Sequence, residues 1–284
     1  QASTTRREIP MNGRRAIVGL CMLCALLASA FAAQSASAIT GTTAVTCAKT
    51  GGTQVGVETF HTSRCLPGEG AGEYEHYQIA QNTNTETATT ASGPTKFKAT
   101  LGGVATTFTS TGVSGTGLMV NNVAESGEHY FRRGFKDSFE ETTISPFTKC
   151  FVYKDDGTGT PGPQGVIETE ELVETTLGQG HGVKITPEKG SVLAKFWILD
   201  KNKVGAGGEC AIHGTYNLAG TMIGTPEGAS LAFTHAGVTT QNTLKIGTGE
   251  PTIKAGFEGG LTLEGRTIGS GTPFTPISYT TVTT

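Results

Sequence analysis

Five consecutive residues, Glu73, Tyr74, Glu75, His76 and Tyr77, bring together side chains that could do acid–base chemistry or bind a sugar. In an extended strand, alternate side chains point to opposite faces, so Glu73, Glu75 and Tyr77 share one face. Paired carboxylates are typical of a glycosidase, but a glycosidase places them on separate elements that flank the sugar. Neighbours on one strand face lie roughly 7 Å apart and point in parallel. The sequence therefore favours a polar, exposed strand face and no catalytic residue in this patch.

A second acidic run, Ile167–Glu174, contains four carboxylates: Glu168, Glu170, Glu171 and Glu174. It matches calcium-binding loops in charge only, because it lacks their alternating Asp and Asn residues and their glycine. We expect a solvated strand or a short helix here.

The histidines are scattered along the chain and show no metal-ligand spacing: they are His61, His76, His129, His181, His213 and His235. The segment Gly112–Gly115 is the nearest match to a nucleophile elbow, and its spacing is wrong. No phosphate-binding or dinucleotide-binding glycine motif is present. The sequence therefore assigns no catalytic, metal-binding or cofactor-binding residue. Tyr74, Tyr77 and Tyr130 could form a small aromatic platform.

The N-terminal region has the order of a secretory signal. Arg14 and Arg15 precede an apolar run, Ala16–Leu27, which is followed by small residues that end in Ala36–Ala38. This order predicts a helical signal peptide that is cleaved between Ala38 and Ile39. A retained membrane anchor is the rival interpretation, but it needs about 20 strongly apolar residues and this run is shorter. We therefore assign residues 1–38 to an N-terminal extension and a cleaved leader.

Composition predicts an all-β fold. The 284-residue chain contains 41 glycines and has a formal net charge of −3, with no basic cluster. This charge disfavours nucleic acid as a partner. Threonine is abundant and no long segment has a 3.6-residue apolar period, so pleated strands joined by glycine turns are favoured. We expect antiparallel sheets packed as a sandwich or a barrel.

Four cysteines follow the leader: Cys47, Cys65, Cys150 and Cys210. An even number of cysteines in an exported chain predicts two disulfides. Of the three connectivities we favour Cys47 with Cys65, which closes a short loop, and then Cys150 with Cys210 by elimination.

Apolar alternation predicts three hairpins. Residues 95–110 alternate about a turn at Gly102-Gly103. Residues 214–235 are expected to form two arms that bury Tyr216, Leu218, Met222, Leu231 and Phe233, with Pro226 and Gly228 in a four-residue turn. Residues 250–265 are expected to turn at Gly259-Gly260 and to bury Ile253, Ala255, Phe257, Leu261 and Leu263.

The segment Val192–Asp200 differs from these hairpins, because it is apolar on both faces from Phe196 to Leu199. It predicts a central strand with Trp197 in or beside the core.

A composition break at 157–165, rich in glycine and proline, predicts a linker or a long loop. It divides the chain after the leader into an N-terminal β region, 39–156, and a C-terminal sandwich-like domain, 166–284. The favoured bridge between Cys150 and Cys210 crosses this break, so one large domain is the alternative.

Several stretches resemble a set of secreted Gly/Thr-rich β proteins of unknown function from soil actinobacteria. They are "VTCAKTGG", "ETFHTSRCLPGEGAGEYEHYQIA", "TPEKGSVLAKF", "CAIHGTYNLAGTMIGTPEGASLAFTH" and "TLKIGTG". The resemblance covers the block Cys47–Ala80 and residues 185–284. It implies a signal peptide, an extracellular β-rich fold and paired cysteines, and it implies no activity.

We expect a secreted or cell-surface protein without a cofactor, and we favour a binding or structural domain over an enzyme. Its expected partners are cell-wall or extracellular polysaccharide or protein. The alternative is a secreted hydrolase in which Glu73, Glu75 or Glu170 meets a histidine from another strand. Weak self-association through the uncharged segment 276–284 is a third hypothesis.

Overall fold

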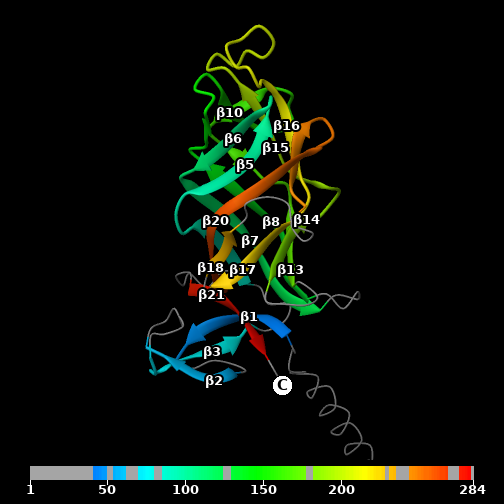
Figure 1. Ribbon diagram of the computed structural model, residues 1–284. Helices are drawn as coiled ribbons and strands as arrows, with labels where there is room; N and C mark the ends of the chain where they lie inside the picture. The colour runs from blue at the N-terminus through cyan, green and yellow to red at the C-terminus, as the bar shows by residue number, and fades with distance from the viewer. Residues whose placement is uncertain are drawn as a thin grey trace, which may run out of the picture. The chain divides into compact units, whose positions relative to one another are not determined.

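The computed structural model describes residues 41–49, 54–61, 70–79, 85–123, 129–176, 182–227, 230–234, 243–267 and 275–282. All regular secondary structure in these ranges is β-strand, so the predicted all-β class is confirmed (Figure 1). The predicted signal peptide and its cleavage site at Ala38 and Ile39 lie outside these ranges. Within them, the structure contains no helix with the length and apolarity needed to cross a membrane.

Eight antiparallel strands close into a ring, which we call the first barrel. Each strand is hydrogen-bonded to the next, and the last pairs with the first, so the ring has no open edge. In ring order the strands are β4 (Thr85–Ala91), β7 (Gly112–Val123), β8 (His129–Glu140), β13 (Leu172–Thr176), β14 (Val183–Pro187), β17 (Met222–Glu227), β18 (Ser230–Thr234) and β20 (Ile253–Thr267).

A second curved sheet extends from both sides of β20. On one side it continues through β5 (Thr95–Leu101), β6 (Val104–Ser110) and β9 (Thr143–Ser145). On the other side it continues through β19 (Lys245–Thr248), β16 (Gly214–Ala219), β15 (Val192–Leu199), β10 (Phe151–Asp155) and β11 (Pro161–Gln164). Its buried apolar side chains include Phe97, Phe108, Phe196, Leu218 and Ile246. These side chains belong to the apolar core of the protein.

β15 is a central strand, as predicted, because it pairs with β10 on one side and β16 on the other. Phe196 and Ile198 are fully buried, whereas Trp197 is half-buried beside the core. A neighbouring two-residue strand, β12 (Ile167–Glu168), pairs with β8.

The prediction of a hairpin turn at Gly259-Gly260 is wrong. Residues 253–267 form a single 15-residue strand, β20, whose first part pairs with β5 and whose second part pairs with β4. The glycines permit close approach of backbones instead of a turn: Gly259 has φ +136°, and a Cβ there would lie 2.9 Å from Thr95 Cγ2. Because of these two glycines, one strand can pair with neighbours in both the first barrel and the second sheet.

The arm predicted from Tyr216 to Met222 is also divided. It forms β16 in the second sheet and β17 in the first barrel, and the chain crosses between them at Gly220, which has φ +108°. A Cβ at Gly220 would lie 2.3 Å from the Thr243 carbonyl oxygen, so only glycine fits. Pro226 lies inside β17 and pairs with Leu231, so the predicted turn position of Pro226 is wrong as well. The expected burial is confirmed for Tyr216, Leu218, Met222, Leu231 and Phe233.

The hairpin predicted for residues 95–110 is confirmed as β5 and β6. Gly102 and Gly103 have φ +59° and +80°, which matches the left-handed pair of a tight hairpin turn. Phe97, Leu101 and Phe108 are buried, as the alternation requires.

A smaller sheet contains β1 (Gly41–Ala48), β2 (Gln54–Phe60), β3 (Tyr74–Gln78) and part of β21 (Thr275–Val282). β21 pairs with β1 from residue 277 onwards and with β20 at its start. The C-terminal segment that we considered for self-association therefore completes a sheet of its own chain.

The predicted bridge between Cys150 and Cys210 is confirmed, with 4.8 Å between the two Cα atoms and a sequence separation of 60. Both sulfurs are buried. The chain-entropy model gives a loop of this length about 4 kcal/mol of stabilisation. Cys47 is also disulfide-bonded, and Cys65 lies outside the described residues.

Strands from both predicted regions build the first barrel. β4, β7 and β8 precede residue 156, and β13, β14, β17, β18 and β20 follow residue 166. The predicted linker, 157–165, contains β11, which pairs with β10.

Candidate functional site

The patch Glu73–Tyr77 lies at the start of β3 and along it. Glu73 forms an exposed ion pair with Lys49, whose ammonium group lies 5.3 Å from the centre of the Tyr74 ring. The Tyr77 hydroxyl donates a hydrogen bond to Glu75 Oε2 over 2.8 Å, so these two side chains share one face, as expected. This patch lines neither of the two hollows described below.

The four glutamates of the acidic run have different environments. Glu168 pairs with Lys154 Nζ at 2.7 Å, whereas Glu170 and Glu171 lie at the surface. Glu174 is fully buried inside the first barrel, where it pairs with Arg132. The expectation of a solvated run is therefore wrong for Glu174, because the alternation of β13 turns that side chain inward.

Among the described histidines, only His129 is buried. Its Nε2 atom lies 2.7 Å from Asn121 Oδ1, and burial lowers the pKa of His129 to about 4. His181 and His235 lie outside the described residues. The described residues contain no group of three or more His, Cys, Asp or Glu side chains that could hold a metal ion.

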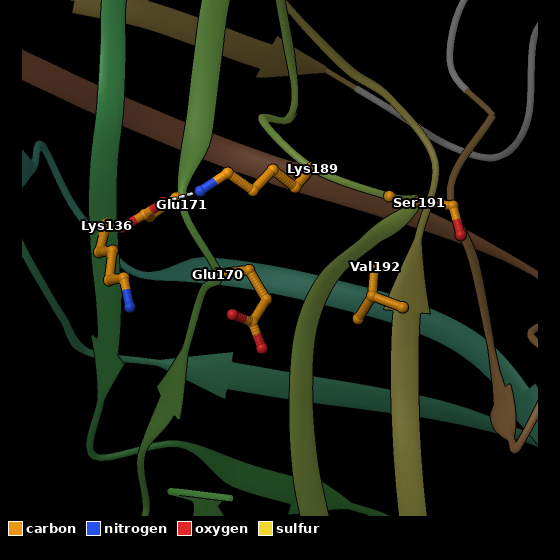
Figure 2. Close-up of a pocket in the computed structure, with 7 residues that line it drawn as sticks. Lys136, Glu170, Glu171, Lys189, Ser191 and Val192 are labelled. Carbon is orange, nitrogen blue, oxygen red and sulfur yellow. Dashed lines mark hydrogen bonds and ion pairs between the residues drawn. The ribbon is translucent and has the colours of Figure 1, made fainter.

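A polar hollow of about 420 Å³ lies in the described part of the chain (Figure 2), and we call it the charged hollow. Three chain segments contribute to it: β8, the segment between β12 and β13, and the turn between β14 and β15. Its volume is within the range of small-molecule sites. It is lined by Lys136, Glu170, Glu171, Lys189, Gly190, Ser191 and Val192.

Backbone hydrogen bonds hold these segments together. The Glu170 N–H donates to the Leu193 carbonyl at 2.8 Å, and the Glu188 N–H donates to the Glu171 carbonyl at 2.7 Å. The charged side chains thus extend from a wall whose backbone is fixed on both sides.

The charged hollow has two cations and two anions. Glu171 Oε2 lies 3.5 Å from Lys189 Nζ, and both side chains are well exposed, so this pair contributes little to stability. Figure 2 shows Glu171 reaching toward Lys189 while Glu170 and Lys136 extend in another direction. Neither Lys136 nor Glu170 forms an ion pair with another described residue. Both remain available to a ligand that carries hydrogen-bonding groups.

A different polar cluster is sealed inside the first barrel. Arg132 pairs with Glu174 and donates from Nη1 to Thr89 Oγ1 at 2.8 Å, and Thr89 also hydrogen-bonds the Asp137 carboxyl. Burial raises the pKa of Asp137, although the positive charge of Arg132 opposes this shift. Asp137 is 1% exposed, so this cluster cannot touch a ligand in solution. The cluster lies on the inner side of the barrel wall, and the neighbouring residue Lys136 is exposed on the outer side.

The hydrolase hypothesis requires Glu73, Glu75 or Glu170 to meet a histidine in a cleft. Of these glutamates, Glu170 lines the charged hollow, and the described residues that line this hollow include no histidine. Sequence reasoning identified Glu170 and Glu171 but missed Lys136, Lys189 and Ser191. No local signal marks these three residues, because their proximity depends on the pairing of strands that are distant in sequence.

No family model, no curated protein and no solved structure matches this chain. The class of protein is therefore defined by the fold and by the candidate site. It is a disulfide-bonded all-β protein with a closed antiparallel barrel and a polar hollow on that barrel.

Proposed function

We propose that this protein is exported and acts outside the cell as a binding module for a polar polymer of the cell surface or the extracellular matrix. In this proposal the charged hollow is the binding site and the protein performs no reaction on its ligand.

Export is supported by the leader-like order of residues 11–38 and by the cysteines. Cys150 and Cys210 form a buried disulfide, and such bonds persist mainly in oxidising compartments. The resemblance to secreted Gly/Thr-rich proteins points in the same direction. N-terminal sequencing of the protein recovered from the medium of an expressing bacterium tests this part, and we expect the chain to start at Ile39.

The observation that carries the binding proposal is the composition of the charged hollow. Charged side chains of both signs, from three segments of a rigid wall, surround one open space of about 420 Å³. Ammonium groups donate hydrogen bonds and carboxylates accept them, so the hollow suits a ligand rich in both donors and acceptors. Polysaccharides of cell walls and matrices have this chemistry.

A pull-down experiment tests the binding proposal. The secreted protein is incubated with purified cell-wall and insoluble polysaccharide fractions, and the bound share is compared with that of the variant Lys136→Ala/Glu170→Ala. The control variant is Lys254→Ala/Glu250→Ala, because these two exposed side chains carry the same charges and line no described hollow. We expect the first variant to lose binding and the control to keep it. Absence of the protein from every pellet contradicts the proposal.

A further inference from the structure

A second, smaller hollow of about 130 Å³ lies over β8, β13 and β14, next to the segments that line the charged hollow. We call it the tyrosine hollow. It is lined by Tyr130, Arg133, Val173, Thr175, Lys184, Thr186, Pro187 and Glu188. This volume is well below the 300 Å³ or more of a typical ligand site, so the tyrosine hollow by itself is too small for a whole ligand.

The floor of the tyrosine hollow is built from the outer face of β13. Leu172 and Glu174 point into the barrel. Successive side chains of a strand point to opposite faces, so Val173 and Thr175 point outward. Outward-facing residues of a barrel wall are normally exposed, yet Val173 is 7% exposed and Thr175 is 2% exposed. They are covered because side chains of β8 and β14 extend on either side of them and form a groove.

An ion pair with a largely exposed Arg133 side chain crosses this groove. Arg133 Nε donates to Glu188 Oε1 at 2.8 Å, and the Glu188 side chain is only 16% exposed. Arg133 belongs to β8 and Glu188 directly follows β14, so the pair links the two strands that flank β13. The pairing of β8 with β13 also contains two register shifts, and such bulges are frequent next to functional sites.

The two hollows follow each other along these strands. Glu188 lines the tyrosine hollow, and the next residue, Lys189, lines the charged hollow. On β8, Arg133 lines the tyrosine hollow and Lys136 lines the charged hollow. Between them the Glu188 carboxylate packs against Gly134, where a Cβ would lie 3.5 Å from Glu188 Oε2, so a ligand that reaches both hollows passes over the Arg133–Glu188 pair. From Tyr130 to Lys136 the strand advances roughly 20 Å, at about 3.3 Å per residue.

We propose that the two hollows are subsites of one groove along β13, and that the groove binds a linear, uncharged polysaccharide chain of several sugar units. This inference rests on the proposed function, because the charged hollow is one of its two subsites.

The charge pattern favours an uncharged ligand. The groove contains the cations Lys136, Arg133, Lys184 and Lys189 and the anions Glu170, Glu171 and Glu188. An anionic or cationic polymer would meet charges of its own sign at both subsites, whereas sugar hydroxyls can donate to carboxylates and accept from ammonium and guanidinium groups. The Tyr130 ring offers apolar surface to the C–H faces of a sugar ring.

The position of β13 disfavours an extended peptide as the ligand. A peptide that adds to a sheet needs an unpaired edge, but β13 is hydrogen-bonded to β8 on one side and to β14 on the other. A ligand of this groove must therefore be recognised by side chains alone.

Titration calorimetry of the secreted protein with two ladders of neutral oligosaccharides tests the inference. The ladders are β-1,4-linked N-acetylglucosamine and β-1,4-linked glucose, each from one to six units. We expect at least one ladder to bind, with an affinity that rises about tenfold or more from trimer to hexamer, since the longer chain reaches both subsites. Tyr130→Ala and Lys136→Ala should each remove this gain, and Tyr74→Ala, which changes a tyrosine outside the groove, should not.

Three results would overturn the inference: no binding of either ladder, an affinity independent of chain length, or tighter binding of an extended peptide of alternating Lys and Glu. The experiments distinguish failure of this inference from failure of the proposed function. If wall binding depends on Lys136 and Glu170 but is unchanged by Tyr130→Ala, the proposed function holds and the two-subsite groove is rejected.

Discussion

Arg132 and Glu174 form an ion pair inside the first barrel, where their side chains are 2% and 0% exposed. The Arg132 guanidinium also lies 3.9 Å from the centre of the Phe135 ring and donates to Thr89. Arg133 follows Arg132 on β8 and Thr175 follows Glu174 on β13, and both residues line the outer groove. The internal pair therefore fixes the wall whose outer face carries the proposed binding site.

Breaking this pair on one side should destabilise the protein strongly. Glu174→Gln leaves the Arg132 charge buried without its counter-charge, which typically costs about 3–5 kcal/mol of unfolding free energy. The double variant Arg132→Leu/Glu174→Leu leaves no buried charge and should cost clearly less. Urea unfolding followed by tryptophan fluorescence measures both values.

Lys189→Ala, which removes the exposed partner of Glu171, is the control for this series. Exposed pairs contribute at most about 1 kcal/mol, so this variant should unfold close to the wild type. A Glu174→Gln variant as stable as the Lys189→Ala variant would show that the internal pair is not a determinant of the fold.

Asp137 should make the protein less stable as the pH rises. Burial raises its pKa in the folded state above the value of 3.8 in the unfolded chain. The stabilisation of the protonated form is fully present below pH 3.8 and is lost as the pH rises through the raised folded-state pKa. Asp137→Asn mimics the neutral acid, so its unfolding free energy relative to the wild type should increase with pH above 3.8. If the unfolding free energies of the wild type and Asp137→Asn change with pH in the same way across pH 4–8, this assignment is contradicted.

His129 should have the opposite effect. Its folded-state pKa of about 4 is below the value of 6.5 in the unfolded chain, because burial disfavours the charged ring. The stabilisation is therefore present above pH 6.5 and is lost as the pH falls from 6.5 toward 4. His129→Gln should remove this part of the pH dependence, which unfolding curves at pH 4, 5, 6 and 7 would measure. An NMR titration that places the midpoint of His129 near 6.5 would refute the prediction.

Gly115 makes room for Asp137 in the wall of the first barrel. A Cβ at position 115 would lie 2.0 Å from Asp137 Oδ1 and 2.8 Å from the Lys136 carbonyl oxygen. Gly115→Ala should therefore cost about 1–3 kcal/mol through overpacking. Gly93→Ala is the matched control, because nothing lies within 4 Å of a Cβ there. Thermal unfolding of the two variants compares them directly, and similar losses of stability would mean that the niche around Asp137 is not tightly packed.

Some structural features follow from local sequence. The alternation in residues 95–110 and the adjacent glycines at 102 and 103 were sufficient to predict β5, β6 and their turn. The apolar stretch around Phe196 was sufficient to predict a central strand. These predictions succeeded because side-chain alternation and left-handed glycine turns are properties of a few neighbouring residues.

Other features depended on distant partners. Gly259-Gly260 resembles a hairpin turn in the sequence, but the alternation of buried residues continues through it from Ala255 to Leu263. The conformation of Gly259-Gly260 is decided by β4 and β5, which both pair with β20. These strands are distant in sequence: Lys98 and Glu258, which form an ion pair, are separated by 160 residues. Glu174 is buried for the same reason, because Arg132 on another strand lies opposite it.

The sequence by itself determined an all-β chain with an acidic balance, a favoured cysteine pairing, the hairpin at residues 95–110 and the central strand around Phe196. Only the tertiary structure decided that the strands close into a barrel, that one strand serves two sheets, and that Lys136, Glu170 and Lys189 surround one hollow. The physical reason is the range of the interactions. Strand alternation and turns are set by neighbouring residues, whereas closure and the binding groove are set by which strands pair across long stretches of sequence.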